Sequence, residues 1–147
     1  NNPDEEAQHI SYNELHSRVC KMANIYKDLG VKKGDRVCIY MPMIPELAVA
    51  TLACARIGAI HSVVFAGFSS AALAARINDA GCKLVVTSDG GFRGNKTINL
   101  KEIVDEALKS NDTVERVIVA KRTHTSVNMT DGRDIWLDDL WVHASDN

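Results

Sequence analysis

Apolar residues follow two different patterns along this chain, a spacing of three and four positions and short continuous runs, and these patterns mark the expected helices and strands. Residues 12–29 carry apolar side chains three and four positions apart, which predicts an amphipathic helix. Ser11 before this helix and Glu14 in its first turn have the spacing of a capping box, and Gly30 supplies the left-handed residue that ends such a helix. The next segment, 36–41, has a short and continuous apolar core at 37–40, and therefore predicts a buried strand.

The same alternation continues to about residue 120. It predicts further helices over about 45–57, 70–79 and 100–109, and further strands over 60–65, 83–87 and 116–120. The helix 45–57 is apolar nearly all round, which predicts that it is packed on more than one side. Short apolar strands that alternate with helices are typical of a parallel sheet covered on both faces. The expected fold class is therefore α/β, with a doubly wound, mainly parallel sheet flanked by helices.

The two ends of the chain differ from this central part. Residues 1–10 are polar and are interpreted as the end of a preceding segment or a linker. Residues 11–120 form the expected α/β subdomain, and residues 121–147 are expected to be a polar loop and a short helix near 135–142 that lead to a downstream part. With four evident strands and no second domain, the chain is expected to be a fragment of a longer protein.

Composition limits the partners of this chain. Hydrophobic residues make up 46% and charged residues 24%, so a packed core is expected. A formal net charge of -2 provides no basic field to attract nucleic acid or an anionic membrane. No apolar run approaches the roughly 20 residues that span a bilayer, and the acidic first residues do not resemble a signal peptide. We therefore expect a cytoplasmic location, with no nucleic-acid or membrane partner.

Cysteine and histidine positions give no metal-ligand spacing, and no metal site is predicted. The four cysteines lie in apolar stretches and are expected to be small buried residues: Cys20, Cys38, Cys54 and Cys82. His61 lies within an apolar strand and is expected to be structural, whereas the other four histidines are expected on the surface: His9, His16, His124 and His143. The acidic pairs near residues 5 and 138 are interpreted as solvated charges, so no catalytic residue is predicted.

Two loops follow predicted strands at their carboxyl ends, where open α/β sheets bind ligands. The loop 66–69 contains Gly67, which could turn the chain or let a ligand approach the backbone. The loop 88–97 combines three glycines with Arg93 and Lys96, a pattern that suits the clamping of phosphate groups. From the residues alone, two solvated loop charges are the simpler interpretation.

A succession of motifs then adds a resemblance. The stretches SYNELHSRV to GDRVCIYMP and LACARIGAIHSVVF resemble the first two core motifs of adenylate-forming enzymes, which include acyl-CoA ligases, peptide-synthetase adenylation domains and luciferases. The stretches HSVVFAGFS, SDGGFRGNKTINLK and GRDIWLDDL resemble the branch of AMP-forming acetyl- and propionyl-CoA synthetases in particular. The resemblance extends from about His9 to the end of the chain.

This resemblance implies a ligase that joins acetate, ATP and coenzyme A in two steps. Acetate and ATP with Mg²⁺ form an acetyl-adenylate and diphosphate, and the coenzyme A thiol then releases AMP. The phosphate loop, ribose-binding aspartate and catalytic lysine of the family are not found in this chain, so the chain alone is expected to be inactive. Two alternatives remain: a propionyl-CoA or other short-chain acyl-CoA synthetase, and a non-catalytic nucleotide- or coenzyme A-binding module.

The resemblance also implies site residues. It implies that the phosphates of coenzyme A bind to four consecutive residues: Arg93, Gly94, Asn95 and Lys96. It also implies that the nucleotide of coenzyme A lies against Gly67 of the earlier loop. The family often has arginine at the position of Lys96 and a small residue at that of Asn95. Lysine keeps the positive charge but lacks the planar fork of arginine. Ala66 stands where glycine is frequent and adds one methyl group.

Overall fold

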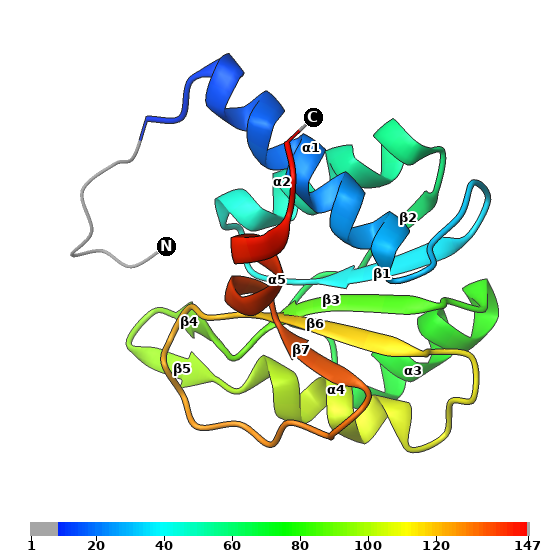
Figure 1. Ribbon diagram of the computed structural model, residues 1–147. Helices are drawn as coiled ribbons and strands as arrows, with labels where there is room; N and C mark the ends of the chain where they lie inside the picture. The colour runs from blue at the N-terminus through cyan, green and yellow to red at the C-terminus, as the bar shows by residue number, and fades with distance from the viewer. Residues whose placement is uncertain (1–8, 147) are drawn as a thin grey trace.

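The computed structural model describes residues 9–146, whose main sheet has helices on both of its faces (Figure 1). The sheet has five parallel strands in the order β2-β1-β3-β6-β7. Their bounds are β1 (Arg36–Tyr40), β2 (Ile60–Val63), β3 (Leu84–Ser88), β6 (Arg116–Ala120) and β7 (Asp134–Trp136). The doubly wound, mainly parallel α/β fold predicted from the sequence is therefore confirmed.

Five helices divide between the two faces of the sheet. One face is covered by α1 (Tyr12–Asp28), α2 (Pro45–Ile57) and α5 (Leu137–His143). The other is covered by α3 (Ser70–Ala80) and α4 (Leu100–Leu108). Because side chains alternate along a strand, Val37 and Ile39 of β1 enter the first core and Cys38 and Tyr40 enter the second.

The predicted ends of the first helix are confirmed in the structure. The Ser11 hydroxyl caps α1 by accepting from the backbone N–H of Glu14 at 3.2 Å. The Glu14 carboxylate does not complete the reciprocal capping box, since it accepts from Arg18 at 2.6 Å. Gly30 has the expected left-handed conformation, with φ of 82°, and the Val31 N–H donates back into the last turn of the helix at 2.9 Å.

Three short strands were missed by the sequence analysis. The predicted polar loop 88–97 instead forms most of an antiparallel hairpin of β4 (Gly91–Arg93) and β5 (Lys96–Ile98). The expectation of four strands in the main sheet is also wrong, because β7 pairs with β6 as a fifth. Each of these strands has three residues, which is too short to display an alternation of apolar and polar positions.

Helix α2 is packed on more than one side, as predicted, because it contacts both α1 and the strands β1 and β2. Its outer face is open, and Leu52 is 44% exposed. Strand β2 lies beside it at the edge of the sheet, ends two residues earlier than predicted, and leaves Ile60 and Val63 about half exposed, at 55% and 49%. The outer face of α2 and strand β2 thus present apolar side chains to the surroundings.

A buried network of charges holds β7 and the loop before it against α4. The Lys101 ammonium lies 2.7 Å from the Asp105 carboxylate and 2.8 Å from that of Asp134, and it donates to the Asn128 carbonyl at 2.8 Å. Arg133 pairs with Asp134 at 2.6 Å and also contacts Asp105. The side chains of Lys101 and Asp134 have no exposed surface, so these two charges stabilise each other without water.

Candidate functional site

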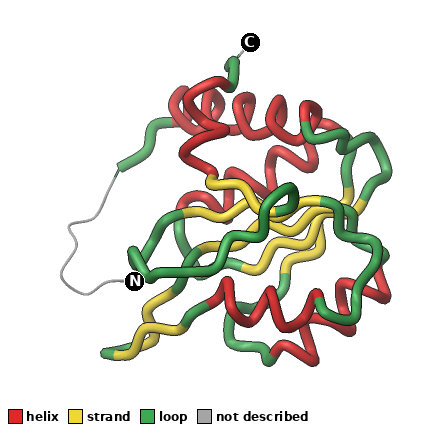
Figure 2. The backbone as a smooth tube through the Cα atoms, turned by 60° about the horizontal axis from the view of Figure 1, so that its bottom comes forward, coloured by secondary structure: helices red, strands yellow, loops and turns green. Residues whose placement is uncertain are grey.

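Both loops that the sequence singled out lie at the same edge of the molecule. The strands of the main sheet are parallel, so their carboxyl ends meet at one edge. The loop after β2 and the hairpin after β3 both leave the sheet there. Figure 2 shows the hairpin β4–β5 projecting from the body of the protein at this edge.

The hairpin places two positive residues opposite each other. Arg93 and Lys96 are paired across the two strands, and Gly94 and Asn95 form the turn between them. Gly94 has a φ of 59°, a left-handed conformation that favours glycine at this tight turn. All four residues are exposed. Because like charges opposite each other in a hairpin repel, a bound anion would relieve the repulsion between Arg93 and Lys96.

The base of the hairpin is fixed by a buried carboxylate that the sequence analysis did not single out. Asp89, 1% exposed, directly follows β3 and accepts from the N–H of Gly90 at 2.7 Å, of Arg122 at 2.8 Å and of Thr123 at 3.0 Å. The Arg122 guanidinium also lies over the Phe92 ring, 5.5 Å from its centre. The hairpin is therefore attached to the segment that follows β6.

The loop after β2 forms the opposite wall of the site. Phe65 and Phe68 contact each other edge to face, with ring centres 6.0 Å apart, and Phe65 is 67% exposed. Gly67 lies between them, and a Cβ atom at this position would stand 2.4 Å from Cε1 of Phe65. The Phe65 ring thus occupies the space that a side chain at position 67 would need.

A cavity of about 360 Å³ separates these two walls. Its lining includes Phe65 and Gly67 on one side, Phe92, Arg93 and Gly94 on the other, and Met43 from the loop after β1. Three of the five residues implied by the resemblance therefore line one cavity. Asn95 and Lys96 lie at the tip of the hairpin, next to this lining but not part of it.

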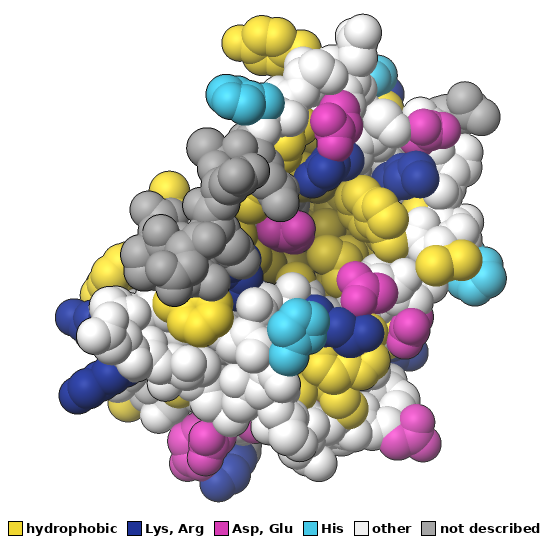
Figure 3. All heavy atoms as spheres, turned by 90° about the vertical axis from the view of Figure 1, so that its left-hand side faces the viewer, with side chains coloured by type: hydrophobic (Ala, Val, Ile, Leu, Met, Phe, Trp, Pro, Cys, Tyr) yellow, Lys and Arg dark blue, Asp and Glu magenta, His cyan; other side chains and the backbone are white. Residues whose placement is uncertain are grey.

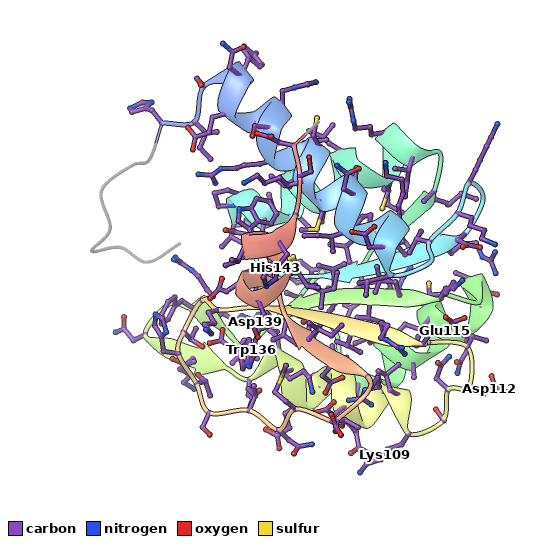
Figure 4. The ribbon with its side chains drawn as sticks, in the orientation of Figure 1. Lys109, Asp112, Glu115, Trp136, Asp139 and His143 are labelled. Carbon is purple, nitrogen blue, oxygen red and sulfur yellow. The ribbon has the colours of Figure 1, made fainter. Side chains whose placement is uncertain are left out.

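The charges of the hairpin are available to a ligand. Within residues 9–146, neither Arg93 nor Lys96 forms an ion pair with a carboxylate. Figure 4 shows Lys109 and Glu115 far from the hairpin β4–β5, whereas Trp136, just before α5, lies nearer to it. An apolar cavity flanked by two unpaired cations suits a ligand that has both a flat apolar part and phosphate groups.

A second hollow opens at the same edge, between α1, α2 and α5. Figure 3 looks onto this edge and shows hydrophobic side chains gathered in the hollow. It has a volume of about 260 Å³ and is lined by Arg18, Met22, Glu46, Val49, Leu137, Asp138 and Trp141. It contains two carboxylates, and its arginine already pairs with Glu14. The hairpin cavity is therefore the better site for an anionic ligand.

The remaining residues that the sequence analysis considered are placed as follows. The four cysteines are free and buried, as predicted: Cys20, Cys38, Cys54 and Cys82. Four histidines are exposed, as predicted: His9, His16, His124 and His143. The expectation that His61 is structural is not met, because this residue is exposed on the edge strand β2. Asp138 is solvated and pairs with Lys121 at 3.1 Å. Within residues 9–146, no helix combines the length and apolar character required to cross a bilayer.

Comparison with known proteins agrees with the fold and with the motifs. The family described as AMP-binding enzyme matches residues 2–141. The chain is 55% identical to the acetyl-coenzyme A synthetase of Bdellovibrio bacteriovorus, over 99% of this chain and 22% of that protein. It is also 55% identical to the acetyl-coenzyme A synthetase of Escherichia coli, over 96% of this chain and 22% of that protein.

A solved structure gives the same result. The acetoacetyl-CoA synthetase of Streptomyces lividans superimposes with a TM-score of 0.85 at 27% identity, over 95% of this chain and 21% of that one. The chain thus spans about a fifth of the length of the relatives that it matches. The family match covers almost the whole chain, and the fold agrees with it. The chain belongs to the AMP-binding enzyme family, and within that family it is similar to acetyl-CoA synthetases.

Proposed function

We propose that this chain is part of an AMP-forming acetate–CoA ligase and that it contributes part of the coenzyme A site. The complete enzyme would convert acetate, ATP and coenzyme A to acetyl-CoA, AMP and diphosphate through an acetyl-adenylate. The observation that carries this proposal is the cavity lined by Gly67, Arg93 and Gly94, with a second cation, Lys96, opposite Arg93 in the hairpin. The residues that would bind ATP and Mg²⁺ lie outside this chain.

Each proposed site residue has a distinct physical role. The Arg93 guanidinium offers two parallel N–H donors to a phosphate, and the Lys96 ammonium adds a mobile point charge on the same tip. Gly94 and Asn95 bring backbone close to the ligand at the turn. Gly67 adds no side chain to the opposite wall, where the Phe65 ring already lies. Together they would hold the phosphates and nucleotide of coenzyme A.

The remaining parts of the proposal concern the organisation and setting of the protein. Residues 11–120 would form the subdomain that carries the coenzyme A loop, and residues 121–147 would lead to the downstream part of the enzyme. The substrates would be small molecules only, with no nucleic acid and no membrane as partner. The enzyme would be located in the cytoplasm.

The test of this function uses the complete polypeptide. It should catalyse acetate-dependent exchange between ATP and diphosphate, and should form a thioester once coenzyme A is added. Acetate should give a higher kcat/KM than propionate, since the relatives are named acetyl-coenzyme A synthetases. The 147-residue chain alone should show no exchange. A complete polypeptide that exchanges diphosphate with neither acid would refute the proposal.

Replacement of Gly67 by leucine tests the loop wall. The new side chain would displace the Phe65 ring and enter the cavity, because a Cβ atom at position 67 already lies 2.4 Å from that ring. We expect a higher KM for coenzyme A, unchanged diphosphate exchange, and little loss of stability, since residue 67 is exposed. Steady-state kinetics of both half-reactions measure this effect. Wild-type thioester formation by folded Gly67→Leu protein would contradict a ligand-facing role for Gly67.

A further inference from the structure

One buried hydroxyl holds the loop that forms a wall of the cavity. Tyr40 is the last residue of β1 and is fully buried. Its hydroxyl donates to the Phe68 carbonyl at 2.7 Å and lies 3.3 Å from the carbonyl of Ala66. These two carbonyls flank Gly67 in the chain. An inner strand of the sheet therefore contacts the backbone on both sides of the proposed ligand-facing residue.

The loop has few other attachments, one of which is the Arg76 guanidinium of α3 over the Phe68 ring, 5.1 Å from its centre. Its internal hydrogen bond runs from the Phe68 N–H to the Phe65 carbonyl at 3.0 Å, and both phenylalanines are exposed. Within residues 9–146, no other hydrogen bond connects the backbone of residues 65–68 to another element. Burial raises the pKa of Tyr40, and the neighbouring Cys38 raises it further, so the hydroxyl remains protonated at neutral pH and can donate.

We propose that Tyr40 is a positioning residue for coenzyme A, whose hydroxyl fixes the loop around Gly67 at the distance from the hairpin that the ligand requires. This inference rests on the proposed coenzyme A site. Tyr40 lies beneath the loop and is not among the residues that line the cavity, so it would act through the loop backbone. Removal of its hydroxyl should leave the first half-reaction unchanged and weaken the use of coenzyme A.

The variant Tyr40→Phe removes this single oxygen from the complete enzyme. We expect the KM for coenzyme A to rise roughly 2- to 10-fold, the change that corresponds to one buried neutral hydrogen bond, with unchanged acetate-dependent diphosphate exchange. Amide hydrogen exchange, measured by mass spectrometry, should become faster in peptides that cover residues 64–69. This second measurement detects release of the loop without any ligand.

Tyr26→Phe is a matched control. Tyr26 is also fully buried, and its hydroxyl donates to the Ala50 carbonyl at 3.2 Å, between α1 and α2 and away from the cavity. The Tyr26→Phe variant should lose a comparable hydrogen bond, yet keep the wild-type KM for coenzyme A and wild-type amide hydrogen exchange in the loop 65–68. An equal effect of both variants on this KM would show a general loss of stability and would overturn the role of Tyr40.

Arg93→Ala, measured in parallel, separates this inference from the proposed function. An unchanged KM in Tyr40→Phe beside a raised KM in Arg93→Ala would overturn the role of Tyr40 and leave the site intact. An unchanged KM in both variants would overturn the site and the role of Tyr40 together. Wild-type hydrogen exchange in the loop of Tyr40→Phe would also overturn the inference, because the hydroxyl would then not hold the loop.

Discussion

Replacement of Arg93 by alanine should raise the KM for coenzyme A by roughly 10- to 150-fold, because a hydrogen bond to a charged group contributes about 1.5–3 kcal/mol. The guanidinium lines the cavity and pairs with no carboxylate in the described chain, so its loss removes a contact to the ligand and leaves no buried charge behind. Acetate-dependent diphosphate exchange should stay near wild type, since coenzyme A takes no part in that step. Steady-state kinetics with varied coenzyme A measure the change.

Arg56→Ala controls for the general loss of a positive charge. Arg56 is exposed in the last turn of α2 and does not line the cavity, so its replacement should leave the KM for coenzyme A unchanged. Added salt should weaken the use of coenzyme A more in the wild type than in Arg93→Ala, since screening acts on the charge that the variant lacks. Equal damage by Arg93→Ala to diphosphate exchange and thioester formation would instead indicate that the hairpin is structural.

Replacement of Lys101 by methionine should lower the free energy of unfolding by about 3–5 kcal/mol, the usual cost of removing one partner from a buried ion pair. The ammonium lies 2.8 Å from the Asp134 carboxylate, and neither side chain is exposed. A loss of this size is a large part of the roughly 5–15 kcal/mol that stabilises a typical domain. Urea unfolding of the wild type and the variant, followed by circular dichroism, measures it.

The double variant Lys101→Met, Asp134→Asn should recover much of this loss, because it also removes the buried carboxylate that would otherwise retain only one of its two cationic partners, Arg133. Burial alone would raise the pKa of Asp134, but hydrogen bonds from Arg133 and Lys101 outweigh it and lower the pKa below its usual value. The contribution of the ionised Asp134 carboxylate to the free energy of unfolding is therefore complete above about pH 4 and is lost as the pH falls through the lowered pKa. The difference in the free energy of unfolding between Lys101→Met and the wild type should become smaller over that acidic range. A constant difference would contradict a charge-based role.

Local patterns in the sequence were sufficient to predict most of the fold. The cap at Ser11 and the left-handed Gly30 bound α1 where expected, because caps depend on neighbouring residues alone. The hairpin β4–β5 and strand β7 could not be predicted in this way. Their pairing is set by the sheet and by the turn at Gly94, and three-residue strands carry no detectable period.

The residues of the candidate site divide in the same manner. Arg93, Lys96 and Gly67 were recognised because charge, glycine content and family resemblance all mark their loops. Tyr40 and Asp89 were not, since they act through hydrogen bonds to backbone groups that lie 26 to 34 positions away in the chain. Such bonds require no particular residue type at the partner position and therefore leave no pattern in the sequence.

Single-turnover thioester formation from preformed acetyl-adenylate tests the central claim most directly, because it isolates the step that uses coenzyme A. The complete enzyme would be loaded with acetate and ATP and then mixed with increasing concentrations of coenzyme A. The account predicts that Arg93→Ala accumulates as much adenylate as the wild type but requires roughly 10- to 150-fold more coenzyme A for half-maximal rate. The same coenzyme A dependence in both enzymes would contradict a phosphate-binding role for the hairpin.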